Sequence, residues 1–105
     1  MNYEERMKQR VLELIDTLDR ENNGEKIGCI TFSRELNRRL GLKMASSMDI
    51  KGSYWNPDIH FLGYDPAIDS FVDRERGPDG KYHAVIFPNG SRELEERYIE
   101  LNIID

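Results

Sequence analysis

Residues 3–21 restrict the fold more than any other segment, because their apolar side chains recur at spacings of three and four residues. This spacing puts the apolar side chains on one face of an α-helix. The side chains on that face belong to Tyr3, Met7, Val11, Leu14, Ile15 and Leu18. Asn2 can cap the start of the helix, and residues 22–24 (Asn-Asn-Gly) can end it in a left-handed turn. The sequence therefore predicts a long N-terminal helix with one buried face.

The next segment predicts a strand and then a second helix. Residues from Lys26 to Phe32 are β-branched and nearly continuously apolar, which is typical of a short strand with both faces partly covered. Ser33 can cap a helix that runs to Leu40, and Gly41 follows at the position where a helix commonly stops. Residues 44–50 are compatible with one or two further helical turns.

A four-residue turn signal divides the second half of the chain. Residues 77–80 read Gly-Pro-Asp-Gly, and strand-forming residues flank them at 70–74 and 81–87. The sequence therefore predicts a β-hairpin at about residues 70–87.

The last fifteen residues predict a short helix followed by a strand. Ser91 can cap a helix that ends at about Glu96, and residues 99–103 alternate apolar and polar side chains with the period of a strand. The whole pattern predicts one α+β domain over residues 1–105. It has a long N-terminal helix, a short second helix and a mainly antiparallel sheet that includes the hairpin and the C-terminal strand.

The charge of the chain is unevenly distributed. Residues 1–51 carry ten Lys/Arg and nine Asp/Glu, a net charge of +1, whereas residues 52–105 carry five and eleven, a net charge of −6. An acidic second half argues against a broad electrostatic footprint on DNA or RNA, which needs clustered positive charge. It is compatible with docking onto a basic partner.

Cysteine usage and hydropathy predict a cytoplasmic protein. The single cysteine, Cys29, excludes an intrachain disulfide, and the first residues lack an apolar targeting segment. No apolar run approaches the length that crosses a membrane, so no membrane partner is predicted.

Cys29 and His83 are the one pair that could support nucleophilic catalysis. A reactive cysteine needs a helix N-terminus or a neighbouring histidine to stabilise its thiolate. Because Cys29 falls inside the predicted strand, four residues before the predicted helix cap at Ser33, the helix dipole should not reach it. We interpret Cys29 as a small core residue and predict that the protein is not an enzyme, with a Cys29/His83 hydrolase or transferase as the last alternative.

No metal ion or cofactor is predicted. The two histidines and their neighbouring carboxylates lack the close spacing of zinc sites: His60, His83, Asp58, Asp65 and Asp69. Asp73, Glu75 and Asp79 lack the spacing of a calcium loop, and we interpret them as a solvated hairpin tip. The isolated glycines match no phosphate-binding motif.

A basic segment suggests nucleic-acid binding as an alternative function. Residues 33–43 contain Arg34, Arg38, Arg39 and Lys43, against Glu35 alone. With residues 44–48 the segment resembles a helix-turn-helix, and the hairpin could serve as a wing.

Three observations weigh against this winged-helix-like alternative. Asn37 replaces the usual small residue of the first helix, the recognition segment at residues 43–51 has basic side chains only at its two ends, and the domain as a whole is acidic. An amphipathic helix with a Glu35–Arg39 ion pair explains the same residues.

Residues 53–65 concentrate aromatic side chains in a segment punctuated by Pro57 and Gly63. Tyr and Trp on loops are enriched at binding hot spots, although the same side chains could equally seal a small core. The partner-binding candidates are Tyr54, Trp55, Tyr64, Asp58 and Asp65. The preferred interpretation is a protein-binding, regulatory module, such as an inhibitor or immunity-type protein, that docks on a larger basic macromolecule.

Overall fold

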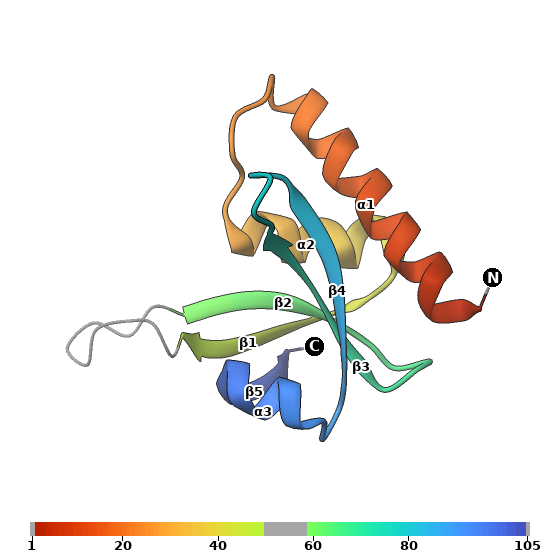
Figure 1. Ribbon diagram of the computed structural model, residues 1–105, viewed down its shortest axis with the longest axis vertical. Coiled ribbons are helices and arrows are strands. Elements are labelled where there is room, and N and C mark those ends of the chain that lie inside the picture. Colours follow the sequence, from red (N-terminus) through yellow and green to blue (C-terminus); the bar gives the residue numbers. More distant parts are fainter. Residues whose placement is uncertain (1, 50–58, 105) are drawn as a thin grey trace.

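The computed structural model describes residues 2–49 and 59–104. Its elements are α1 (Tyr3–Glu21), α2 (Cys29–Leu40), β1 (Lys43–Asp49), β2 (Ile59–Asp65), β3 (Ser70–Arg76), β4 (Tyr82–Pro88), α3 (Arg92–Arg97) and β5 (Tyr98–Ile104). The strands form one antiparallel sheet in the order β4-β3-β2-β1-β5. The predicted α+β fold, with its hairpin and C-terminal strand, is confirmed (Figure 1).

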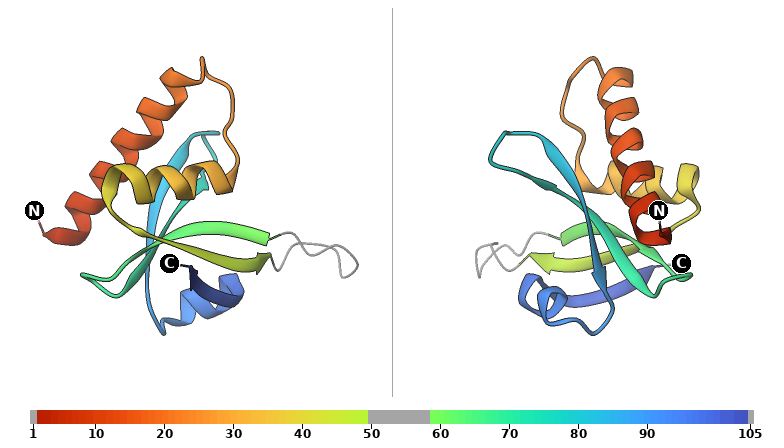
Figure 2. Two further views of the ribbon diagram at one scale, coloured as in Figure 1. Left: turned by 180° about the vertical axis from the view of Figure 1, so that it is seen from behind. Right: turned by 45° about the vertical axis from the view of Figure 1, so that its right-hand side comes forward.

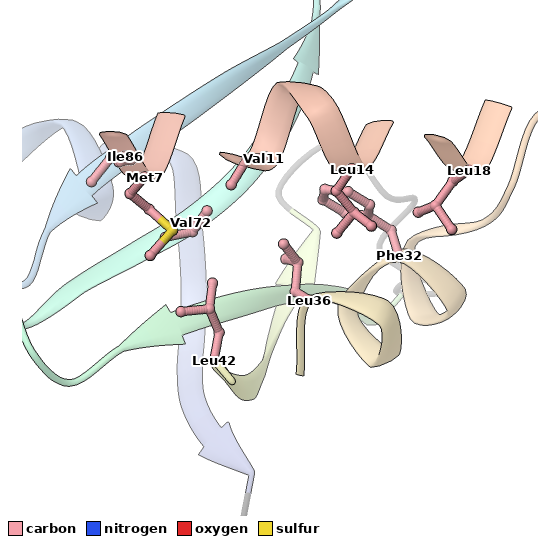
Figure 3. Close-up of a cluster of buried hydrophobic side chains, with 9 residues drawn as sticks. All are labelled: Met7, Val11, Leu14, Leu18, Phe32, Leu36, Leu42, Val72 and Ile86. Atoms are coloured by element: carbon pink, nitrogen blue, oxygen red, sulfur yellow. The ribbon is translucent and has the colours of Figure 1, made fainter. Parts of the chain in front are cut away.

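The sheet separates two hydrophobic clusters. Helices α1 and α2 cover one face, while α3 lies on the other side of the strands (Figures 1 and 2). Neighbouring residues of a strand point to opposite faces, so on β3 Val72 belongs to the larger cluster under α1 and α2, and Phe71 to the smaller one that includes Leu94 of α3. In Figure 3 the apolar side chains of α1 lie over Phe32 and Leu36 of α2.

The predicted helix start at Asn2, the helix ends at residues 22–24 and at Gly41, and the cap at Ser91 are confirmed. The Asn2 side chain accepts a hydrogen bond from the Glu5 backbone N–H at 2.8 Å, and α1 ends at residues 22–24 with Asn23 at a φ of 54°. Gly41 ends α2 in the left-handed conformation with a φ of 72°. The Ser91 side chain caps α3 by accepting from the Leu94 N–H.

The strand predicted from Lys26 to Phe32 is wrong, as is the predicted helix cap at Ser33. Helix α2 already begins at Cys29, and Ser33 lies inside it, fully buried, with its hydroxyl donating to the Leu62 carbonyl at 2.6 Å. The helix turns Phe32, Ser33 and Leu36 onto one buried face against the sheet. Burial of that face outweighs the preference of the β-branched residues for a strand, so the segment is helical.

The helical turns predicted for residues 44–50 are also wrong over residues 44–49, and residue 50 lies outside the described residues. Residues 43–49 form β1, which pairs with β2 on one side and with the edge strand β5 on the other. Ala45 and Ser47 alternate as buried residues on one face of this strand. The helix-turn-helix arrangement therefore lacks its second helix, because a strand occupies that position.

Strand β5 contains an irregularity that its alternating sequence does not reveal. Met48 of β1 pairs with Ile99, but Ser46 pairs with Asn102, so β5 has one extra residue in this stretch, and Glu100 has a φ of 51°. Such a bulge changes which side chains face the core. Leu101 packs on the smaller cluster, while Ile99 is exposed.

No helix in the described part of the chain is long and apolar enough to cross a membrane.

Candidate functional site

A cleft of about 630 Å³ opens beside α3 on the face of the sheet that α1 and α2 leave uncovered. It is lined by Ser47, His60, Asp73, Arg74, Glu75, Phe87, Glu93, Glu96, Arg97 and Tyr98. These residues come from all five strands and from α3, so the cleft exists only in the folded sheet. Its volume falls within the range of small-ligand sites, roughly 300–1,000 Å³.

Asp73 organises the inner wall of the cleft. Its side chain is only 3% exposed. One carboxylate oxygen, Oδ2, accepts a hydrogen bond from the Tyr98 hydroxyl at 2.5 Å and lies 2.7 Å from Nε2 of His60. The other, Oδ1, accepts from the Arg74 backbone N–H at 2.8 Å. Both oxygens are therefore used within the fold, and Oδ2 lies between the His60 and Tyr98 rings, which stack with centroids 5.9 Å apart.

Burial, and then the negative charge of Asp73, raise the pKa of Tyr98 far above its ordinary value of about 10. Above about pH 10 the tyrosine of the unfolded chain loses its proton, whereas Tyr98 of the folded chain keeps it. The free energy of unfolding therefore falls as the pH rises. We expect the urea midpoint of the wild type to fall more steeply between about pH 9 and pH 11 than that of Tyr98→Phe. Parallel pH profiles would show that Tyr98 is solvated.

Ser47 lies next to this network with its hydrogen-bonding capacity unused. It faces His60 across β1 and β2, and its side chain is 2% exposed. Within the described residues, its Oγ is the one buried side-chain polar atom without a hydrogen-bond partner. A buried hydroxyl without a partner is unfavourable by about 1–3 kcal/mol. An unused hydroxyl on the wall of a cleft can instead serve a ligand.

Carboxylates and one stacked guanidinium form the outer part of the cleft. Glu75 comes from β3, and Glu93 and Glu96 come from α3. The Arg97 guanidinium lies 5.3 Å from the centre of the Phe87 ring and pairs with Glu75 at 2.9 Å. The side chain of Arg74 leaves the cleft for the opposite face, where its guanidinium lies 4.8 Å from the centre of the Phe32 ring. Among the described residues that line the cleft, three glutamates therefore accompany the guanidinium of Arg97.

The residues predicted to bind a partner are not brought together in this cleft. Tyr54, Trp55 and Asp58 lie outside the described residues. The Tyr64 hydroxyl donates to Asp69, and its ring packs against Phe71 with centroids 4.9 Å apart. Asp65 is buried and accepts hydrogen bonds from the Tyr3 hydroxyl and the Ala67 N–H, each at 3.0 Å. Tyr64 and Asp65 thus make bonds inside the fold.

The prediction that Asp73, Glu75 and Asp79 form a solvated hairpin tip is wrong for Asp73. Because β3 extends to Arg76, Asp73 lies within the sheet and is buried, and Asp79 alone of the three stands in the turn. A hydrogen bond from the Lys81 N–H, and then the His83 ring, lower the pKa of the Asp79 carboxyl. Within the described residues, no three His, Cys, Asp or Glu side chains gather as a metal site.

Cys29 and His83 occupy separate parts of the fold. Cys29 is the first residue of α2 and is partly buried, so the prediction that it lies in a strand, out of reach of the helix dipole, is wrong. His83 lies on β4, with Nε2 3.2 Å from the Asp79 carboxylate. Both residues are described, and no hydrogen bond joins them.

The basic residues of α2 are partly neutralised by glutamates. Arg38 and Arg39 both pair with Glu35, and Arg39 also makes two hydrogen bonds to the Glu21 carboxylate, at 2.7 and 3.0 Å. Glu21 and then Glu35 raise the pKa of the Arg39 guanidinium. Arg34 and Lys43 are exposed. The positive surface that α2 offers is therefore smaller than its composition indicates.

Sequence reasoning missed the cleft as a site. Glu93 and Glu96 resemble ordinary solvated helix residues, and Ser47 falls in a segment predicted to be helical. The available signal was Asp73, a charged residue in a strand beside Phe71 and Val72. A carboxylate at such a position is buried only with hydrogen-bond partners.

Comparison with known proteins finds no matching family model, no matching curated protein and no matching solved structure.

Proposed function

We propose that the protein is a non-enzymatic binding module that docks onto a basic surface of a larger protein through the cleft beside α3. The observation that carries this proposal is the set of three glutamates, Glu75, Glu93 and Glu96, arranged around a cleft with aromatic walls. Aromatic rings supply contact area at an interface, and charges at its rim steer the approach of an oppositely charged partner. An inhibitor or immunity-type protein would act by covering that surface.

The distribution of charge supports a basic partner. The net charge of −6 belongs to residues 52–105, the half of the chain that supplies most of the cleft. Rim glutamates add to the local negative potential, which raises the rate of encounter with a positive surface at low salt. Nucleic acid carries the wrong sign for this cleft.

A comparison of two charge-matched variants tests the proposal. Glu93→Gln/Glu96→Gln removes two negative charges at the cleft, and Glu5→Gln/Glu13→Gln removes two exposed negative charges on α1. We expect the wild type and the α1 variant to retain the same basic protein from an extract of the source cell. The cleft variant should bind that protein, once purified, at least about tenfold more weakly, with a smaller dependence on salt. Equal binding by both variants, or no retained protein, would contradict the proposal.

A further inference from the structure

We propose that the cleft receives the guanidinium group of an arginine side chain. This inference rests on the proposed function, because it specifies which basic group of the partner enters the cleft. Arginine is planar, weakly hydrated and able to stack on aromatic rings while it donates up to five hydrogen bonds. The cleft offers a surface for each of these properties.

The protein already binds one of its own guanidinium groups in this cleft. Arg97 stacks over Phe87 and pairs with Glu75 at 2.9 Å. An aromatic ring and a carboxylate beside each other are the two partners that a guanidinium prefers. The walls of the cleft are therefore chemically suited to a second group of the same kind.

Two further carboxylates are available for such a group. Glu93 makes no ion pair within the described residues. Glu96 pairs with Arg92, but their side chains are 65% and 90% exposed, and an ion pair that exposed is weak. An incoming arginine that is partly desolvated against the aromatic walls can replace Arg92 as the partner of Glu96.

Ser47 supplies the inner contact, and it is the observation that points to a ligand rather than to acidic residues alone. Ser47 lines the cleft and is more than nine-tenths buried, and its Oγ has no hydrogen-bond partner among the described residues. A guanidinium N–H can donate to this oxygen. Asp73 does not compete for the ligand, because both of its oxygens are already bonded to the fold.

Three small probes distinguish arginine from other ligands. The ¹⁵N-labelled full chain is titrated with N-acetyl-arginine amide, with N-acetyl-lysine amide, and with N-acetyl-citrulline amide, which has nearly the shape of arginine without its charge. We expect the arginine probe to shift the backbone amides of Ser47, Phe87 and Glu93, with a dissociation constant on the order of 1 mM. The lysine probe should bind at least about threefold more weakly because its ammonium is more strongly hydrated. Equal binding of citrulline, or arginine shifts confined to other surfaces, would overturn the inference.

Two variants locate the contacts. Ser47→Ala should retain the native spectrum, because the hydroxyl bonds to nothing in the described fold, and should weaken arginine binding about three- to tenfold. Glu93→Gln/Glu96→Gln should weaken it at least as much, whereas Glu5→Gln/Glu13→Gln should not. Unchanged binding by Ser47→Ala would overturn the inner contact.

The outcomes separate this inference from the proposed function. If the cleft variant loses the basic partner but the wild type does not bind the arginine probe, the docking proposal stands and the arginine inference fails. If neither the partner nor the probe responds to the cleft variant, both fail.

Discussion

Replacing Phe32 with alanine is expected to lower the free energy of unfolding by about 3–5 kcal/mol. The Phe32 ring is fully buried between α2, α1 and the sheet, and the Arg74 guanidinium lies over it. The substitution leaves a cavity in the larger hydrophobic cluster, which the surrounding helices can only partly fill. Such a loss is a large fraction of the 5–15 kcal/mol that typically stabilises a domain. Urea unfolding followed by circular dichroism measures it.

Ile30→Ala is the matched control, and it also tests the conformation of this segment. Ile30 is 37% exposed on α2, so its truncation should change the unfolding free energy far less than that of Phe32. In a helix, residues two apart point in very different directions, whereas in a strand they share a face. Comparable losses for Ile30→Ala and Phe32→Ala would therefore indicate the strand that the sequence predicts for residues 26–32, and contradict helix α2.

The elements that could be predicted are those whose signals are local in sequence. Helix α1 has a long apolar period and an Asn cap, the β3–β4 hairpin is marked by a four-residue turn, and α3 begins after a capping Ser91. Each of these signals acts within a few residues, and packing of the sheet does not override them, as it does the predicted cap at Ser33. The α+β class followed from these elements.

The two elements predicted with the wrong secondary structure lie where tertiary packing decides the conformation. Residues 26–32 are apolar enough for a strand, but helix α2 buries Phe32 and Leu36 together and leaves Ile30 at the surface. Residues 43–49 have little strand preference of their own, yet β1 gains partners on both sides from β2 and β5. Local propensity is a weak signal for such segments.

The candidate site could not be predicted because it depends on the register of distant strands. Ser47 and His60 become neighbours only when β1 pairs with β2, and Tyr98 reaches Asp73 across 25 positions of sequence. Glu93 and Glu96 become part of a cleft only when α3 lies beside the sheet. Residue type alone indicates solvated carboxylates at Asp73, Glu93 and Glu96.

Asp73→Ala is expected to lower the free energy of unfolding by about 3 kcal/mol or more. The substitution removes the acceptor of the Tyr98 hydroxyl and of the Arg74 N–H, together with the oxygen that lies beside His60. Hydrogen bonds to a charged group contribute about 1.5–3 kcal/mol each, and a buried group that loses its partner stays desolvated. Asp16→Ala removes an exposed carboxylate from α1 and should leave the unfolding free energy within about 0.5 kcal/mol of the wild type.

Combining Asp73→Ala with Tyr98→Phe separates the loss of hydrogen bonds from the loss of packing. In the wild type, Tyr98→Phe leaves Asp73 without its shortest hydrogen bond and should be destabilising. In the Asp73→Ala background the Tyr98 hydroxyl is a buried donor without that acceptor, so removing it should be nearly neutral or stabilising. We therefore expect the two substitutions to be non-additive by at least about 1 kcal/mol, measured by urea unfolding of all four proteins. Additive losses would show that Asp73 and Tyr98 act independently, and the rigid inner wall of the cleft would then need another explanation. Non-additive losses would show that the Asp73 carboxylate and the Tyr98 hydroxyl act as one unit in the inner wall of the cleft.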